Sequence, residues 1–293
     1  MSDQALALFE IPAEDLAPLA AAADAVCVQP RLAEWVESTT ADLAAAMGRP
    51  SPPPPLQAWP EGEPDVVTYL PVLALAQTMP ATLAWAASRR IPAAVIAATM
   101  RDVGRMLRRN RLWYGEPGLG HELAGWVARH AVGSILELGR LQHERSAAGV
   151  RTGQWLLADG ADFAPGDVCV NLHIPQSGPL DPSVVNESLR AGRRLLRTRF
   201  PEERLKVRFC VSWLLDPQLL DYLPESSNLL AFQRRFRIGP AKDDNGDVSV
   251  RKFVFGNSPL PVNELPQRSS LERAVVAHWK RGGHWRVHVG RLL

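Results

Sequence analysis

Residues 167 to 215 leave little choice of fold class, because two strand-like segments flank a single helix. The segments GDVCVNLHIP and LKVRFCVSWLL are rich in apolar and β-branched residues and predict strands over about 168–174 and 205–213. Between them, Asp181 is a capping residue and Pro182 needs no N–H donor in a first turn, so together they predict a helix start. Two strands joined by a helix imply a crossover connection, and we expect an α/β or α+β arrangement.

The rest of the second half is expected to extend this sheet. Residues 139–160 alternate and break in the manner of a hairpin, and residues 226–236 show helical spacing. We expect a further strand over 246–256 and a last strand within the C-terminal segment 278–290. The predicted fold is therefore a mixed β-sheet flanked by helices.

The first half is predicted to be mostly helical. Residues 1–49 are rich in Ala and Leu and predict two or three short helices, and helical spacing returns over 66–139, where Pro92 is placed to open a helix. The run from 50 to 64 contains too many prolines for regular structure, because proline removes backbone donors and fixes φ. We expect a stiff loop there.

Composition allows two domains and argues against several functions. The 293 residues suffice for a helical domain over 1–135 and an α/β domain over 136–293. With 33 Lys+Arg against 31 Asp+Glu the net charge is +2, so no basic field favours nucleic acid or an anionic membrane surface, and a small-molecule partner fits better. The cysteines Cys27, Cys169 and Cys210 lack paired spacing, which favours a reducing compartment. Without a basic and apolar leader pattern, the expected location is cytoplasmic, and the oligomeric state stays open.

Residues 66–88 carry no charged side chain and are long enough to span a bilayer. They contain Pro71 and Pro80, and a proline in a lone spanning helix frees a carbonyl that no neighbouring helix could satisfy. We therefore expect a buried core helix, with a membrane-spanning helix as the alternative.

Several motifs, in their order along the chain, resemble those of a known family. In the second half they are LGRLQHER, GDVCVNLHIPQSGPLDPSVVNESL, FCVSWLLDPQL, LPESSNLLAFQRRF, VFG and LPQRSSLERAVVAHWKRGGHW. In the first half they are IPAAVIAATMRDVGRMLRRNRLWYGEPGLG and WVARHAVGSILELGRLQ. Together they cover most of the chain and resemble the two-domain bacterial acyltransferases, which have a helical N-terminal domain and a GNAT-like C-terminal domain.

The resemblance implies transfer of an acyl group from acyl-CoA, either acetyl-CoA or a longer thioester, to an amine of a small molecule, with no metal. In such folds the two central parallel strands splay to admit the pantetheine arm, and a backbone N–H polarises the thioester carbonyl. The turn PQSGPLD would then face the pyrophosphate of coenzyme A. The residues that the resemblance places at the cofactor are Ile174, Gln176, Ser177, Gly178, Leu180, Ser188, Arg193 and Asn228.

Aminolysis of a thioester needs a neutral amine, and a histidine at the end of the first central strand is suited to take its proton. His173 is the first candidate for this base, and the alternative is a satisfied core histidine. Glu144 is a candidate for orienting the amine or acting through water, and the alternative is a salt bridge with Arg145 or Arg151. A nucleophilic role for Cys210 would require exposure and a lowered thiol pKa.

The sequence departs from the family pattern in two places. The usual phosphate-binding loop is glycine-rich, whereas this turn has Gly178 followed by Pro179, and the Asp181 carboxylate is placed to compete for the same helix N-terminus. Arg235 stands where a tyrosine commonly protonates the leaving thiolate. The candidate substitutes are Tyr222 and Ser227. These departures keep a second class open, a catalytically silent GNAT-like binding or scaffold protein.

Three groups of charged or polar residues can each be interpreted either structurally or functionally. Four arginines follow one face of the helix after Pro182, as a solvated face or as a cationic surface for phosphates: Arg190, Arg193, Arg194 and Arg197. A basic set in the first half lies beside Trp113 and Tyr114 and favours a solvated face over single-stranded nucleic acid: Arg101, Arg105, Arg108, Arg109 and Arg111. The C-terminal histidines lack carboxylate or cysteine companions and do not indicate a metal: His278, His284 and His288.

Overall fold

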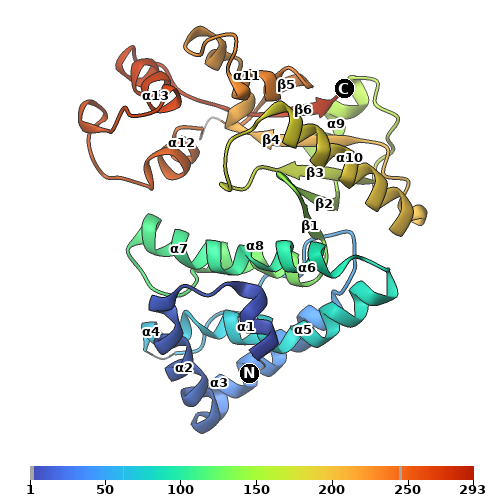
Figure 1. Cartoon of the computed structure of the whole chain (residues 1–293), viewed down its shortest axis with the longest axis vertical. Helices are drawn as coiled ribbons and strands as arrows, with labels where there is room; N and C mark the ends of the chain where they lie inside the picture. Colours follow the sequence, from blue (N-terminus) through green and yellow to red (C-terminus); the bar gives the residue numbers. More distant parts are fainter. Residues whose placement is uncertain (1–2, 62, 244–245) are drawn as a thin grey trace. The chain divides into compact units, whose positions relative to one another are not determined.

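The computed structural model describes residues 3–61, 63–243 and 246–293. The chain divides into two compact units, Met1–Glu137 and Leu138–Leu293, which we call unit 1 and unit 2. Figure 1 traces the chain through both units.

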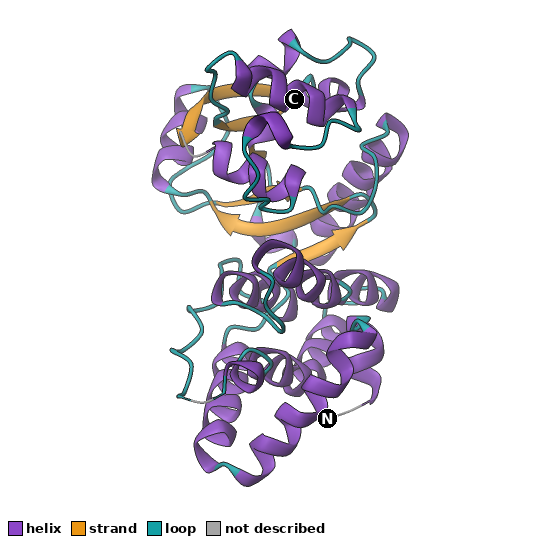
Figure 2. Ribbon diagram, turned by 90° about the vertical axis from the view of Figure 1, so that its left-hand side faces the viewer, coloured by secondary structure: helices purple, strands orange, loops and turns teal. Residues whose placement is uncertain are grey.

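Unit 1 is helical, and Figure 2 shows its helices in purple. They are α1 (Asp3–Phe9), α2 (Ala13–Val28), α3 (Pro30–Ala45), α4 (Pro64–Val67), α5 (Leu70–Ser88), α6 (Ala93–Met100), α7 (Asp102–Tyr114) and α8 (His121–Ala131). Residues 50–61 and 63 of the proline-rich run form no helix or strand, as predicted, and its last residue, Pro64, begins α4. Side chains hold this run in place: Trp35 Nε1 donates to the Ala58 carbonyl at 3.0 Å, and Ser134 Oγ donates to the Ser51 carbonyl at 2.9 Å.

Helix α5 supplies much of the core of unit 1. By length and composition the segment Asp65–Ser88 is apolar enough to cross a membrane, but 72% of its most apolar window is buried inside the protein. Its hydroxyls are satisfied within the unit, since Thr78 donates to the Ala74 carbonyl and Thr82 to the Ala131 carbonyl, both at 2.8 Å. Burial of this extent supports the interpretation as a core helix.

A mixed six-stranded sheet has the order β1-β2-β3-β4-β6-β5, and five of its strands lie within unit 2, whereas β1 includes the last residues of unit 1. The strands are β1 (Ile135–Leu138), β2 (Leu141–Ala147), β3 (Val168–His173), β4 (Arg208–Ser212), β5 (Phe236–Asp243) and β6 (Val287–Leu292). The central strands β3 and β4 are parallel, and helix α10 (Pro182–Arg199) makes the crossover between them, as predicted. The pairs β2–β3, β4–β6 and β5–β6 are antiparallel. The predicted fold class is confirmed.

Alternating side chains assign the residues of the central strands to two faces of this sheet. On one face His143 pairs with Leu172, and Val170 pairs with Arg208. Helix α10 packs closely here, because a Cβ at Gly192 would lie 2.2 Å from the His143 ring. We call this the α10 face. Helix α11 (Asn228–Gln233) lies beside α10.

The opposite face, which we call the α9 face, carries the other residues of the same strands. Glu144 pairs with Asn171, and Asn171 pairs in turn with Phe209. Helix α9 (Val150–Ala158) covers part of this face, since Leu156 packs in one buried cluster with Phe209. His173 lies two residues beyond Asn171 and therefore on the same face.

A second core in unit 2 lies under α12 (Gly246–Phe255) and α13 (Ser270–Lys280). Its buried side chains include Trp213, Leu219, Val250, Val276 and Trp285. The remaining short helices are 3-10 turns, at Pro201–Glu203, Trp213–Leu215, Pro217–Asp221 and Val262–Glu264.

Two of the predicted elements are wrong. The expected hairpin over 139–160 is strand β2 followed by helix α9, and the expected strand over 246–256 is helix α12. The apolar alternation in the latter is misleading, because Val248 is exposed while Val250 is buried against the second core. Strand β5 was not predicted, and the C-terminal strand begins only at Val287, after α13.

Candidate active site

The two candidate catalytic residues lie side by side on the α9 face. His173 is the last residue of β3, and its Nε2 lies 2.8 Å from Oε2 of Glu144 on β2. Asn171 Nδ2 donates to the same carboxylate oxygen at 3.2 Å. The Glu144 side chain is 2% exposed, whereas 21% of the His173 side chain is exposed. A buried carboxylate thus orients an imidazole that remains accessible from solvent.

The alternative interpretation of Glu144, an edge-strand salt bridge, does not fit the position of Arg145. The neighbouring Arg145 points to the other face of β2, where its guanidinium forms an ion pair with Glu203 and lies 3.8 Å from the Phe200 ring centroid. Because side chains alternate along the strand, the adjacent charged residues lie on opposite faces: Arg145 pairs with Glu203 on one face, and Glu144 contacts His173 on the other.

The turn after β3 is held by an arginine that the sequence analysis did not identify. Arg140 donates from Nε to the Pro179 carbonyl at 2.8 Å, from Nη1 to the Pro175 carbonyl at 2.8 Å and from Nη2 to the Gly178 carbonyl at 2.7 Å. Gly178 has a φ of 127°, which a residue with a side chain rarely adopts. Three carbonyls of the turn thus face one guanidinium, and the turn is shaped before any ligand arrives.

Helix α10 begins at Pro182, as the Asp-Pro pair predicts, and Asp181 occupies the N-cap position. The expected side-chain cap is wrong, because the Asp181 side chain makes no capping hydrogen bond and instead Asn228 Nδ2 donates to its Oδ1 at 2.6 Å. The carboxylate is therefore held by α11 and not by the backbone N–H groups of α10.

Comparison with known proteins fits this geometry. Residues 135–292 match the family described as the GNAT-like C-terminal domain, and residues 2–133 match the N-acyltransferase N-terminal domain. The chain belongs to this two-domain acyltransferase family. A comparison with curated protein sequences finds no match.

Solved structures of acyltransferases resemble the whole chain. An acyltransferase in complex with decanoyl-CoA is 31% identical, with a TM-score of 0.83 over 100% of this chain and 88% of that chain. An acyltransferase in complex with decanoyl-CoA and teicoplanin is 32% identical, with a TM-score of 0.83 over 99% of this chain and 86% of that one. A mutant acyltransferase in complex with octanoyl-CoA has the same identity, coverage and TM-score as the teicoplanin complex. The coarse activity of the family, acyl transfer from coenzyme A thioesters, follows for this chain.

The residues expected at the cofactor lie in different surroundings. Gln176, Ser177 and Gly178 are exposed in the turn, and Gln176 donates to the Phe253 carbonyl of α12. Ile174 is half-buried and Leu180 is buried at the two ends of the turn.

Ser188 and Arg193 lie further along α10. The Ser188 hydroxyl is buried, donates to the Leu138 carbonyl and accepts from the Leu141 N–H at 3.0 Å, so it ties α10 to the β1–β2 turn. Arg193 is exposed and lines a pocket on the α10 face.

His143 of β2 is buried against α10 at Gly192. Its burial lowers the pKa of His143 to about 3, which keeps the ring neutral.

The two candidate substitutes for the missing tyrosine are used within the fold. Tyr222 OH lies 3.1 Å from His278 Nδ1 of α13, and its ring packs edge-on against Trp285. Ser227 caps α11, accepting from the Leu229 N–H at 3.3 Å. These hydrogen bonds connect both residues to α11 and α13 and not to His173.

The thiol and metal alternatives find no support in the structure. Cys210 is buried, and burial raises its pKa to about 12, so the thiolate needed for a nucleophile does not form near neutrality. Within the described part of the chain no group of three histidine, cysteine, aspartate or glutamate side chains is arranged to hold a metal. The C-terminal histidines have separate partners, since His284 pairs with Asp247 and His288 Nδ1 lies 3.0 Å from the Gly239 carbonyl.

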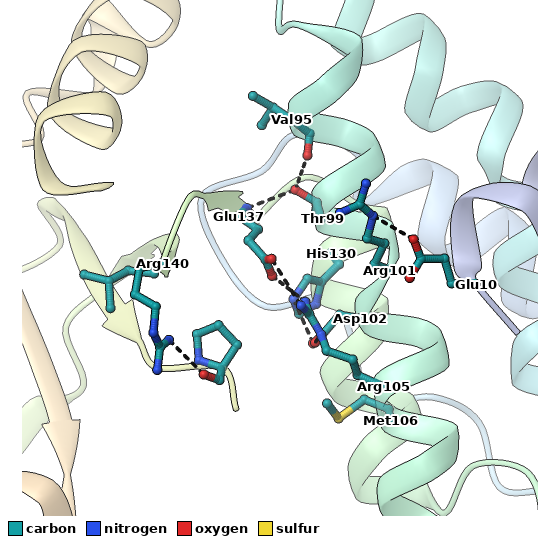
Figure 3. A network of polar contacts seen from close by, with 12 residues as sticks. Glu10, Val95, Thr99, Arg101, Asp102, Arg105, Met106, His130, Glu137 and Arg140 are labelled. Carbon is teal, nitrogen blue, oxygen red and sulfur yellow. Dashed lines mark hydrogen bonds and ion pairs between the residues drawn. The ribbon is translucent and has the colours of Figure 1, made fainter. Parts of the chain in front are cut away.

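A second histidine–carboxylate pair lies in unit 1, within the polar network of Figure 3. His130 Nε2 is 3.2 Å from Asp102 Oδ2, and the same carboxylate accepts from Arg105 Nε at 2.6 Å and from Trp126 Nε1 at 2.8 Å. Arg105 also forms an ion pair with Glu137. Both His130 and Asp102 are buried, and burial lowers the pKa of His130. This network is an internal brace of unit 1.

Three arginines of the basic set in the first half have carboxylate partners. Arg101 contacts Glu10 at 2.9 Å, and Arg111 contacts the buried Asp15 at 2.8 Å, in addition to the pairing of Arg105 with Asp102 and Glu137.

Proposed function

We propose that the chain is an N-acyltransferase that moves a medium-chain acyl group from coenzyme A to the amine of a small molecule. The observation that carries the proposal is the His173–Glu144 pair at the end of β3, directly before a turn that Arg140 holds in place. Two of the similar structures bind decanoyl-CoA and octanoyl-CoA, which supports a donor longer than acetyl. A third holds teicoplanin, which supports a small-molecule acceptor.

In this proposal His173 is the general base. When Nε2–H donates to Glu144, the imidazole lone pair lies on Nδ1, and this atom takes a proton from the attacking amine. The Glu144 carboxylate then stabilises the imidazolium, and Asn171 fixes the position of the carboxylate. The amine nitrogen forms a bond to the thioester carbon while the C–S bond breaks. The thiolate leaves with the electron pair and takes a proton from the imidazolium or from water.

The turn from 175 to 181 is proposed to bind the pyrophosphate of the donor. The carbonyls of Pro175, Gly178 and Pro179 accept from Arg140. Since its prolines have no N–H, the backbone donors of the turn belong to the remaining residues: Gln176, Ser177, Gly178, Leu180 and Asp181. The N–H of Ser177 already donates to the Pro175 carbonyl at 2.9 Å. The N-terminus of α10 adds a favourable dipole for an anion.

The test is a turnover assay with acetyl-, octanoyl- and decanoyl-CoA, each with and without an amine acceptor such as teicoplanin or an amino sugar. We expect release of the coenzyme A thiol that depends on the amine, an increase in acceptor mass equal to the acyl group, and faster turnover with the longer donors. Saturable acyl-CoA binding without any turnover would favour the silent binding protein. Thiol release without acylated acceptor would indicate a thioesterase and contradict the proposal.

A further inference from the structure

A pocket on the α10 face of unit 2 is lined by five arginines. Its volume is about 300 Å³, at the lower end of the range for small-ligand sites. The arginines come from three elements or their ends, namely α10, the start of β4 and the end of α11: Arg190, Arg193, Arg208, Arg234 and Arg235. Asn186 and three leucines complete the lining, and no Asp or Glu side chain of the described residues lines the pocket.

The guanidinium groups in this pocket are only partly compensated. Arg235 donates to the Asn186 side chain and, at 3.3 Å, to the Pro182 carbonyl, while its buried Nε finds no acceptor among the described residues. Arg234 lies 3.6 Å from Glu225, an exposed and therefore weak ion pair. For Arg190, Arg193 and Arg208 the described residues provide no ion pair.

The fold holds the positive charges of Arg193 and Arg208 close together, which is electrostatically unfavourable. The pKa of Arg208 is lowered, first by the burial of its half-buried guanidinium and then by repulsion from Arg193. An anion between them would relieve both effects, because it replaces lost hydration and screens the repulsion. Like charges gathered round a concave surface also raise the local concentration of anions.

The arginine pocket is separate from the His173–Glu144 pair. Arg208 pairs with Val170, one residue away from Asn171, so its side chain points to the opposite face of the sheet from Asn171 and His173. Along α10, Arg193 lies about 16 Å from the helix N-terminus at Pro182, at a rise of ~1.5 Å per residue. The pocket is therefore distinct from the turn that holds the proposed pyrophosphate site.

We infer that the arginine pocket binds a phosphate monoester or diphosphate group. The planar guanidinium matches a phosphate with two parallel hydrogen bonds, and several of them together suit a group with two or more negative charges better than a carboxylate. Two sources share this chemistry. One is the 3′-phosphate of the coenzyme A donor, which rests on the proposed function, and the other is a separate phosphorylated molecule, which does not.

The first experiment is calorimetric titration of the full chain with inorganic pyrophosphate at low ionic strength. The variants are Arg193→Gln and Arg208→Gln, and the matched control is Arg197→Gln, an exposed arginine one turn further along α10 that does not line the pocket. We expect one saturable site, at least about tenfold weaker in either pocket variant and nearly unchanged in the control. Arg193 is exposed, so its substitution keeps the test valid if Arg208→Gln unfolds.

Three results would overturn the inference: no saturable binding of pyrophosphate, equal weakening in Arg197→Gln, or loss of binding in Arg140→Ala alone, which would place the ligand at the turn. A second titration with coenzyme A and 3′-dephospho-coenzyme A identifies the source. If Arg193→Gln weakens the binding of coenzyme A but not that of 3′-dephospho-coenzyme A, the pocket is assigned to the 3′-phosphate. If the substitution changes the binding of neither molecule, the pocket is assigned to a separate phosphorylated ligand. Intact pyrophosphate binding in a protein without acyl transfer would contradict only the proposed function.

Discussion

His130–Asp102 in unit 1 and His173–Glu144 in unit 2 both bring an imidazole close to a carboxylate, in opposite environments. His173 Nε2 is hydrogen-bonded to Glu144 at 2.8 Å and part of the His173 ring reaches solvent. The His130 side chain is fully buried, and its Nε2 lies 3.2 Å from Asp102 without a hydrogen bond to any described residue. Asp102 also accepts from Arg105 and Trp126, so its pair belongs to an internal network. The difference shows that an oriented imidazole becomes a candidate base only where a substrate can reach its second nitrogen.

The largest expected effect comes from His173→Gln, which removes the proposed base. We expect kcat to fall by about 10²–10⁴-fold, the usual contribution of general base catalysis, because glutamine cannot take the amine proton. The thermal unfolding temperature and the acyl-CoA affinity should change little, since the ring is partly exposed at the end of β3. Steady-state kinetics and acyl-CoA titration measure both.

The matched variant His130→Gln is expected to have the opposite effects on stability and on kcat. It should lower stability and leave kcat per folded molecule near that of the parent, because the His130 ring is inaccessible. Loss of turnover in folded His130→Gln would break the comparison and move the functional pair to unit 1.

Asp102→Ala is expected to have the largest effect on stability. Arg105 and His130 would lose the carboxylate that both face inside the unit, and breaking a buried ion pair by removing one partner costs about 3–5 kcal/mol. Chemical denaturation of the full chain measures this loss. A change below about 1 kcal/mol would show that Glu137 alone is enough to satisfy Arg105.

How much of these pairs the sequence could predict depends on the distance between partners. His173 and Glu144 were each identifiable as candidates from a strand ending in a histidine and a strand carrying a carboxylate. Their contact depends on the register of β2 against β3, in which Gln142 and not Glu144 is directly opposite His173. Glu144 and His173 are 29 residues apart, and the sequence of neither strand alone determines how the two strands are paired.

The same limit explains what the sequence missed. Arg140 donates to carbonyls 35 to 39 residues away along the chain. The Asp181 side chain does not make the predicted capping hydrogen bond, because it accepts from Asn228, 47 residues away. Helix α12 was predicted as a strand because its valines alternate, and tertiary packing decided which of them is buried. Local patterns thus predicted the central β3–α10–β4 unit, whose elements are long and strongly patterned, but not its long-range hydrogen bonds.

Glu144→Gln sharpens the comparison by keeping the shape of the pair and removing its charge. We expect kcat to fall by about ten- to a hundredfold, because the imidazolium loses a charged hydrogen-bond partner. The KM for acyl-CoA should stay nearly constant, since Glu144 orients His173 and the donor is held by the turn. An equal change in kcat and KM, or loss of fold by circular dichroism, would show that the carboxylate serves only the sheet.

The last prediction concerns the pH dependence of stability and the buried histidines. Burial holds the pKa of His143 at about 3 in the folded chain, against about 6.5 in an unfolded one. As the pH falls below about 6.5 the unfolded chain binds this proton first, so stability is lost at ~1.4 kcal/mol per pH unit towards pH 3 and is unaffected above that window. The lowered pKa of His130 acts in the same direction.

Urea unfolding at a series of pH values between neutral and mildly acidic conditions measures this slope, and His143→Gln should reduce it by about one proton. The slope is the readout because the substitution also changes packing against Gly192, which shifts stability equally at every pH. Equal slopes in the two proteins would mean that His143 is protonated in the folded state. Burial alone would then fail to distinguish structural histidines from His173, and only the approach of a substrate would separate the two kinds of pair.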